Sequence, residues 1–261
     1  MREQRIEVLL YEQRRLLDAA FDDFIEALTA VAGGQMEHLV RDVRRALRSG
    51  ELKQLENLAF SLRGRYSRTI RDALVQFMSQ AKRIAAAEVG VTPGAPSTAA
   101  RAEVAVKAGQ IADLHAARWQ AQTVLDVLNA RGAGLTIPAA VAAATEALAE
   151  RAQRDIQATA NIVVNDAINE GRNEGLQAGD IQGYQYSAIL DDRTCALCED
   201  LDGMTLVRGD ARFDEFNPPI HDRCRCVWIG VLSDEVDFRP EWRDPSADMI
   251  AAHGSLIVER N

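Results

Sequence analysis

Residues 191–226 read DDRTCALCEDLDGMTLVRGDARFDEFNPPIHDRCRC and contain all four cysteines of a 261-residue chain. Cys195 and Cys198 form a Cys-x-x-Cys pair, and 25 residues separate it from a second pair, Cys224 and Cys226. Zinc takes four soft or borderline ligands in a tetrahedron, and a Cys-x-x-Cys turn supplies two thiolates through one local closure. In an extended segment residues i and i+2 face the same side, so the second pair can complete the set. The spacing therefore predicts a structural Zn²⁺ site.

His221, three residues before Cys224, is a fifth candidate ligand. A closed structural site holds four protein ligands, so binding by this histidine would leave one cysteine, for instance Cys224, outside the coordination sphere. Three other interpretations of the cysteines compete with zinc. A redox motif would need a βαβ context, a disulfide framework would need an oxidising compartment, and unrelated buried thiols are not expected to cluster within so short a span.

The cysteines lie in a loop-rich segment of short strands. Apolar and polar residues alternate from Gly183, and residues 227–231 form a second β-type run. Such a segment has too few large apolar side chains for a core of its own, so bound zinc would supply folding free energy. We therefore expect a small zinc-stabilised α+β module over residues 183–233, followed by an extended acidic tail over residues 234–261.

Long amphipathic helices are predicted before this module, because apolar residues recur there at spacings of three, four and seven. Gly33-Gly34 and Ser49-Gly50 are expected to interrupt the first region (residues 1–90), in which residues 51–89 form one helix. The linker over residues 91–97 opens the second region (residues 91–182). Thr98 is expected to cap the next helix, Pro138 to start the last one, and Gly171, Gly175 and Gly179 to weaken its end. The fold class is therefore mainly α, an elongated long-helix region before the module.

Most of the net charge of −9 lies in the C-terminal part of the chain. Residues 187–261 carry 16 acidic and 8 basic residues, against 23 and 22 in residues 1–186. An acidic module disfavours a protein that coats nucleic acid, because neutralising phosphates requires a basic surface. The sequence also contains no run of about 18 apolar residues, so we expect no membrane association and reduced cysteines in the cytoplasm.

The module resembles the phage Mu F-like head-morphogenesis family, and the long helices before it also resemble that family. The residues that correspond to the family's motif are Asp191, Arg193, Thr194, Cys195, Cys198, Gly203, Pro218, Pro219, His221, Cys224, Arg225 and Cys226. Family members vary at the cysteine and histidine positions, so the resemblance leaves the metal-ligand set open. In physical terms, Arg193 is expected to tie its strand to Asp191 or to a loop carbonyl, and the two prolines to fix the approach of the second cysteine pair.

The resemblance implies a structural protein without catalytic activity. Its relatives are minor head (minor capsid) proteins of tailed bacteriophages, and they act with the portal in procapsid assembly and in DNA packaging or retention. The implied partners are the portal protein, the major capsid or scaffold protein and the packaged DNA. The implied location is the virion head near the portal, in several copies per particle, with the host cytoplasm as the site of assembly.

Two other functions compete with this one. A metal-dependent nuclease or toxin-like enzyme would use His221 as general base and Asn217 to orient it, but a zinc ion held by four thiolates has no open position for water. A nucleic-acid-binding zinc ribbon would need basic and aromatic residues on the module, which is acidic. DNA contact by Arg41, Arg44, Arg45 and Arg48 in the helical region stays open, although arginines at this spacing more often form a solvated helix face, as the near-neutral charge of residues 1–186 also indicates.

Overall fold

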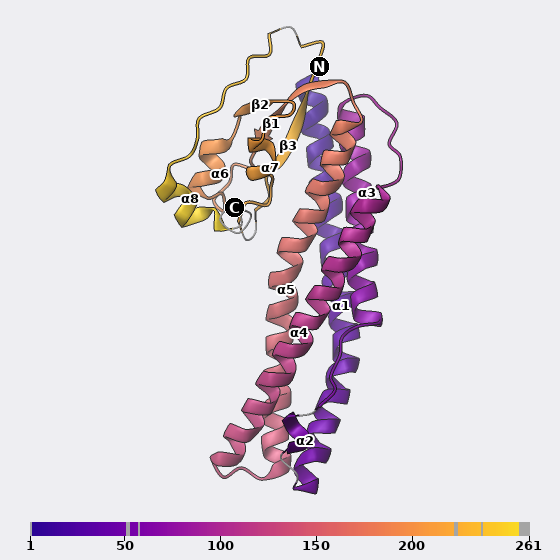
Figure 1. Ribbon diagram of the computed structural model, residues 1–261, viewed down its shortest axis with the longest axis vertical. Helices are drawn as coiled ribbons and strands as arrows, with labels where there is room; N and C mark the ends of the chain where they lie inside the picture. The colour runs from indigo at the N-terminus through magenta and orange to yellow at the C-terminus, as the bar shows by residue number, and fades with distance from the viewer. Residues whose placement is uncertain (1, 51–52, 57, 222–223, 236, 256–261) are drawn as a thin grey trace. The chain divides into compact units, whose positions relative to one another are not determined.

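The computed structural model describes residues 2–50, 53–56, 58–221, 224–235 and 237–255, and these are mainly helical with one small sheet near the C-terminus (Figure 1). The elements in chain order are α1 (Arg2–Ser49), α2 (Lys53–Glu56), α3 (Arg65–Glu88), α4 (Thr98–Gly132), α5 (Ile137–Gln177), β1 (Ile181–Ser187), α6 (Ala196–Leu201), β2 (Thr205–Val207), α7 (Arg212–Glu215), β3 (Val227–Leu232) and α8 (Ala247–His253). The predicted mainly α class with a small C-terminal sheet is confirmed. No helix within the described ranges is both long enough and apolar enough to cross a membrane.

The chain forms two compact units, each assembled from separated parts of the sequence. We call the first the helical unit, which comprises residues 20–73 and 102–160. We call the second the sheet unit, which comprises residues 1–19, 74–101 and 161–261. Four long helices, α1, α3, α4 and α5, contribute residues to both units. The sheet unit therefore draws on all four segments predicted from the sequence.

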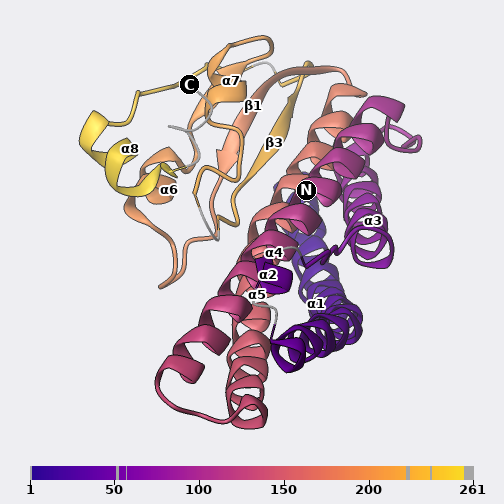
Figure 2. The same ribbon diagram turned by 60° about the horizontal axis from the view of Figure 1, so that its bottom comes forward.

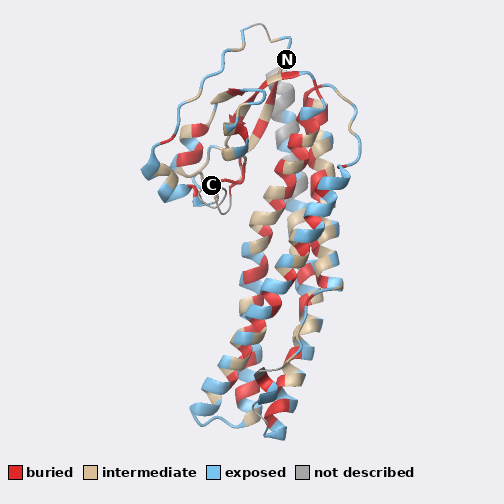
Figure 3. Ribbon diagram, in the orientation of Figure 1, coloured by how far each residue is buried: buried red, intermediate tan, exposed pale blue. Residues whose placement is uncertain are grey.

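The helical unit buries one side of each helix, which appears as red stripes along the ribbons in Figure 3. A polar network lies inside this core. The hydroxyl of Tyr66 lies 2.7 Å from Nδ1 of His115, and Nε2 of His115 lies 3.0 Å from Oγ1 of Thr159. The indole of Trp119 stacks on the His115 ring and donates a hydrogen bond to Asp155 (2.9 Å). Side chains from α3, α4 and α5 are thus joined by directional bonds as well as by apolar packing.

Two predictions for the first helical region are wrong: the interruption at Gly33-Gly34 and the single helix over residues 51–89. α1 continues through Gly33 and Gly34, because the cost of about 1 kcal/mol for each helical glycine is outweighed by the burial of Leu28, Ala32 and Leu39 along the same face. The helix ends at Ser49, before Gly50 with a φ of +73°, as predicted. The predicted single helix over residues 51–89 does not form, since α2 ends at Glu56 and α3 starts only at Arg65.

Residues 58–64, which precede α3, are held in place by contacts that no periodicity indicates. The backbone N–H of Phe60 donates to the side-chain oxygen of Gln120 in α4 (3.3 Å), and Leu62 is fully buried. Gly64 adopts a φ of +91°, which a residue with a side chain rarely tolerates. These local demands outweigh the helical pattern of the segment.

Two predicted features at the ends of α4 and α5 also need correction. Ser97 rather than Thr98 caps α4, because its Oγ accepts the backbone N–H of Ala100 (3.1 Å). Gly171 and Gly175 do not weaken α5, which runs to Gln177. A Cβ on Gly171 would lie 2.1 Å from the carbonyl oxygen of Met78, so this glycine lets α5 approach α3 closely within the sheet unit.

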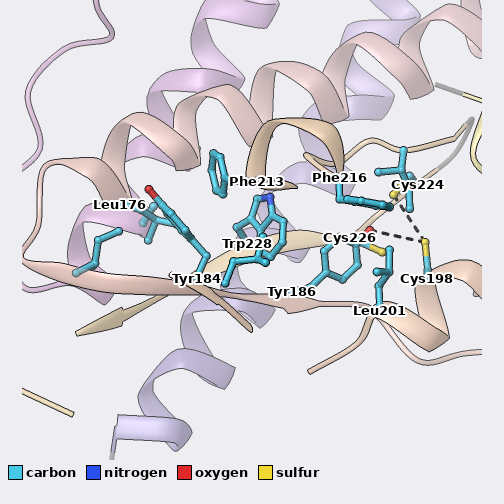
Figure 4. Packing of buried hydrophobic residues seen from close by; sticks show 14 of the residues in the cluster. Leu176, Tyr184, Tyr186, Cys198, Leu201, Phe213, Phe216, Cys224, Cys226 and Trp228 are labelled. Carbon is cyan, nitrogen blue, oxygen red and sulfur yellow. Dashed lines mark hydrogen bonds between the residues drawn. The ribbon is translucent and has the colours of Figure 1, made fainter. Parts of the chain in front are cut away.

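The sheet has the antiparallel order β2-β1-β3, with β1 in the centre. Tyr186 of β1 pairs with Trp228 of β3, and both side chains are fully buried. Figure 4 shows these rings in one cluster with the cysteines and with Leu176 of α5. The core of the sheet unit is therefore shared between the strands and the ends of α3 and α5, which the small module could not supply alone.

The tail after β3 is only partly the extended segment that the sequence predicts. The backbone N–H of Thr205 donates to the carbonyl of Glu241 (2.8 Å), so residues near 241 run beside β2. Residues 247–253 then form α8, whose first turn is capped by Ser246 and which packs against α6 (Figure 2). Residues 256–261 lie outside the described part of the chain.

Candidate metal centre

The ends of regular elements position the two cysteine pairs in the sheet unit. Cys195 is the N-cap of α6, and its sulfur accepts the backbone N–H of Cys198 (3.4 Å). Cys226 directly precedes β3, the strand that pairs with β1. Cys198, Cys224 and Cys226 are buried, whereas Cys195 is partly exposed. The start of a helix and the start of a strand thus bring together thiols that are distant in sequence.

The candidate ligand atoms form two overlapping groups. Nε2 of His221 lies 3.2 Å from Sγ of Cys195 and 3.1 Å from Sγ of Cys198. Sγ of Cys198 lies 4.0 Å from Sγ of Cys224 (Figure 4). Within the group Cys195, Cys198 and His221, and within the group Cys198, Cys224 and Cys226, the ligand atoms lie within 4.8 Å of one another. Two sulfurs on one tetrahedral zinc stand about 3.8 Å apart, so the donor types and spacing fit that ion.

Cys198 belongs to both groups, and hydrogen bonds among the neighbouring sulfurs shift the pKa values of the cysteines. The Cys198 and Cys226 thiols hold the pKa of Cys224 well below its usual range, because both donate hydrogen bonds to its sulfur. The same hydrogen bond to Cys224, together with burial, raises the pKa of Cys198. The protein's own groups thus stabilise one thiolate among three buried sulfurs. A second thiolate in this cluster requires the positive charge of a cation.

The turn before the first cysteine pair is held by Asp191. Its two carboxylate oxygens accept two hydrogen bonds from the guanidinium of Arg225, at 2.8 and 2.5 Å. The backbone N–H of Arg193 donates to the same carboxylate (3.0 Å), and the hydroxyl of Thr194 accepts the backbone N–H of Asp191 (3.0 Å). The bond to Arg225 lowers the pKa of the Asp191 carboxyl well below its usual range. The Asp191 turn is thereby tied to the segment that carries the second cysteine pair.

Arg193 has a lesser role than the sequence predicts. Its side chain is 67% exposed and its guanidinium lies 3.7 Å from the Asp191 carboxylate, whereas Arg225 makes the two-pronged contact. The expected tie between the strand and Asp191 exists, but Arg225 supplies most of it. The predicted motif residues Asp191, Thr194 and Arg225 are thus brought together in space.

The other motif residues shape the chain between the two cysteine pairs. Gly203 has a φ of +78°, and its N–H donates to the carbonyl of Tyr186 (2.9 Å), which turns the chain from α6 into β2. Pro218 and Pro219 are joined by a cis peptide bond just before the buried Ile220. Asn217 accepts a hydrogen bond from Asn173 of α5 (3.1 Å), while the imidazole of His221 faces two cysteine sulfurs. These contacts lend no support to His221 as a catalytic base oriented by Asn217.

The sheet unit also contains a buried ion pair that no sequence motif indicates. Arg172 of α5 and Glu88 of α3 lie 2.7 Å apart, and both side chains are fully buried. Arg172 also donates to the backbone carbonyl of Trp228 in β3, at 2.9 and 3.2 Å. Both residues lie in helical stretches where charges are usually solvated, so no sequence signal distinguishes them. They tie two helices of the sheet unit to the strand that follows Cys226.

The fold and the site together define a cysteine-rich strand module built onto long helices. Residues 124–229 match the family model described as Phage Mu protein F like protein, a range that includes every cysteine and every motif residue named above. The match confirms the family resemblance predicted from the motif, and it suggests a phage head-morphogenesis protein. No curated protein and no solved structure matches the chain significantly.

Proposed function

We propose that this chain is a minor head protein of a tailed bacteriophage that acts with the portal in procapsid assembly and in DNA packaging or retention. The observation that carries the proposal is the family match over residues 124–229, a segment whose motif residues include the Asp191–Arg225 pair and the clustered cysteines. The role is structural and non-catalytic. Its place is the virion head near the portal, in several copies per particle, after assembly in the host cytoplasm.

We propose further that one Zn²⁺ ion holds the module together. The candidate ligands are Cys198, which belongs to both groups, with three of Cys195, His221, Cys224 and Cys226. Support comes from the donor chemistry and from the electrostatics, because the neighbouring thiols lower the pKa of Cys224 while burial helps to raise the pKa of Cys198, and a cation favours the thiolate form of both. A closed site of four protein ligands supplies folding free energy and leaves no position for a reacting water.

The protein partners follow from the same proposal. The portal subunit is the principal partner, with the major capsid or scaffold protein and the packaged DNA as further neighbours in the head. The portal contact is tested by co-expression of this chain with the portal protein and purification through a tag on the portal. Recovery of the chain in a fixed ratio to the portal supports the proposal, and its complete loss in the wash counts against it.

Quantitative mass spectrometry of gradient-purified particles tests the location. Procapsids and DNA-filled particles from the native host are digested, and peptides of this chain are counted against peptides of the portal subunit. A few to a few tens of copies in procapsids, whether or not they persist in filled particles, are expected. Absence from both kinds of particle would remove the proposal.

A further inference from the structure

The exposed face of α4 carries an apolar strip within the helical unit. Its members are Leu114, Ala117, Ala121, Leu125 and Leu128. They recur at spacings of three and four, so they fall within an arc of about 80° at 3.6 residues per turn. Leu114 is 64% exposed, Leu125 is 50% exposed and Leu128 is 38% exposed. The opposite face of α4 buries Ala112, Trp119 and Val127 in the core, so the strip is a second apolar face on one helix.

A groove of about 620 Å³ runs beside the strip. Its lining includes Ala117, Ala121 and Leu125 of the strip, the polar side chains of Asp113 and Gln120, and Leu55, Phe60 and Ser61 from the segment before α3. The small alanine side chains leave room above the helix for a large side chain from outside. This arrangement resembles the apolar groove that receives one helix of a partner.

We propose that the strip is a self-association surface on which α4 packs antiparallel against α4 of a second copy, with the twofold axis at Ala121. In that register Leu114 lies opposite Leu128 of the second copy, and Ala117 lies opposite Leu125 of the second copy. The ends of the strip then pair leucine with leucine, and its middle pairs leucine with alanine. Leu125 of the second copy enters the groove next to Ala117. A parallel pair would instead stack alanine on alanine and leave the groove unfilled.

Charge at the edge of the strip favours the same partner and direction. Asp113 and Arg131 are separated by 18 residues, about five helical turns, so both project along the same edge of α4. The antiparallel register brings Asp113 of each copy beside Arg131 of the second copy, which gives two equivalent opposite-charge contacts. Asp113 is half-exposed in its surface pair with Arg63, and the exposed Arg131 donates to the backbone carbonyl of Leu135 but pairs with no acidic side chain within the described ranges. Both groups are thus accessible to a second copy.

The strip spans four turns, a length near the lower limit for stable interfaces, so the association is expected to be reversible in the micromolar range. Sedimentation velocity of the full chain over a wide concentration series measures it. Ala121→Arg places two guanidinium groups on the twofold axis and is expected to weaken association at least tenfold. Ala105→Arg is the matched control, because Ala105 is also exposed on α4 but lies outside the strip. Circular dichroism melting checks that both variants are folded.

A charge exchange tests the register. Asp113→Arg and Arg131→Asp, each alone, are expected to weaken association several-fold, and the double variant is expected to recover it. The double variant still lacks the surface pair with Arg63, so recovery reports the contact between copies.

A wild-type chain that stays monomeric at all concentrations, or association unaffected by Ala121→Arg, overturns the proposal. Failure of the double variant to recover overturns the antiparallel register. The wild-type chain could stay monomeric while Ala121→Arg abolishes its capture by the portal. That result would assign the strip to another protein and overturn the second copy as its occupant.

Discussion

Arg172 and Glu88 form an ion pair from which solvent is fully excluded, although they stand 84 residues apart in sequence. Desolvating two charges costs several kcal/mol for each ion, and their attraction offsets this only when hydrogen bonds satisfy the remaining donors. The carbonyl of Trp228 accepts two of those donors. The pair therefore fixes the relation of α3, α5 and β3 inside the sheet unit more than it adds net stability.

Removing one partner of this pair is expected to be far more damaging than removing both. Arg172→Met leaves a buried carboxylate, and Glu88→Met leaves a buried guanidinium, so each is expected to lower the free energy of unfolding by about 3–5 kcal/mol. The double variant is expected to lose clearly less than either single change. Urea titration of all three variants measures this, with Arg71→Met as an exposed control. Additive losses in the double variant would show that the two side chains are not coupled.

Zinc content should depend on Cys198 above all other cysteines, because it belongs to both ligand groups. Cys198→Ser is expected to abolish binding of one zinc per chain and to lower the melting temperature. Cys195→Ser and Cys226→Ser are expected to reduce both quantities, and comparison with Cys224→Ser and His221→Ala identifies the four ligands. Elemental analysis and melting with and without a chelator are the measurements. Full zinc content in Cys198→Ser would refute the site.

The Asp191–Arg225 contact should make the module sensitive to acid. The folded pKa of this carboxyl is depressed, so its stabilising contribution is present above the unfolded value near 4 and is lost as pH falls below it. Asp191→Asn is expected to lower the melting temperature at pH 7 and to flatten its decline at low pH. Asp192→Asn, at an exposed neighbour, is the control. Equal melting temperatures for wild type and Asp191→Asn at neutral pH would mean that the turn does not need this charge.

His115 should add a second acid-sensitive step in the helical unit. Burial lowers its pKa to about 4, while Asp155 opposes this shift and Arg118 adds to it. The neutral ring is therefore favoured in the folded protein, and stability is lost as pH falls from about 6.5, the unfolded value, toward 4. The loss attributable to this residue is at most about 3 kcal/mol.

His115→Gln is expected to lose less stability than wild type over that range, and exposed His38→Gln is expected to behave as wild type. Chemical denaturation at a series of pH values, read as the difference between variants, cancels the contribution of the other titrating groups. Parallel pH curves for wild type and His115→Gln would contradict a buried neutral histidine.

Gly171 should not tolerate even one added carbon. Gly171→Ala would place a Cβ 2.1 Å from the carbonyl oxygen of Met78, so α3 and α5 would have to separate, at a cost of about 1–3 kcal/mol. Gly109→Ala in α4 meets no neighbour within 4 Å and is expected to stabilise the helix by about 0.5–1 kcal/mol. Thermal melting of both variants is the measurement. A neutral Gly171→Ala would mean that the two helices can shift freely.

Local patterns predicted the elements well and their interruptions poorly. The helical stripes, the linker over residues 91–97 and the two strands near residues 184 and 227 follow from periodicity and turn residues, and all are present. The predicted break at Gly33-Gly34 and the predicted weakening at Gly171 were wrong, because a glycine alone does not indicate whether its neighbours gain enough from packing to continue the helix. The short strand β2 was missed because three residues hold too little periodicity.

At the candidate site, the sequence identified the residues but not all of their partners. Clustering of cysteines and the motif located His221, Asp191 and Arg225, since covalent spacing limits where such residues can meet. The choice of Arg225 over Arg193 as the partner of Asp191 depends on strand register, and the pairing of Arg172 with Glu88 depends on how two helices cross. Local sequence spacing encodes neither the strand register nor the helix crossing, so these two pairings follow only from the three-dimensional structure.

The pairing of Arg172 with Glu88 also constrains how this lineage can drift. Replacement of either residue alone would leave an unpaired charge buried in the core. Selection would remove such a destabilised variant before a compensating substitution occurred at the other position. Neutral divergence should therefore preserve the two positions jointly or exchange them jointly. An alignment of distant descendants should record a covarying pair at positions 88 and 172, although the first of these lies well outside the segment that defines the family.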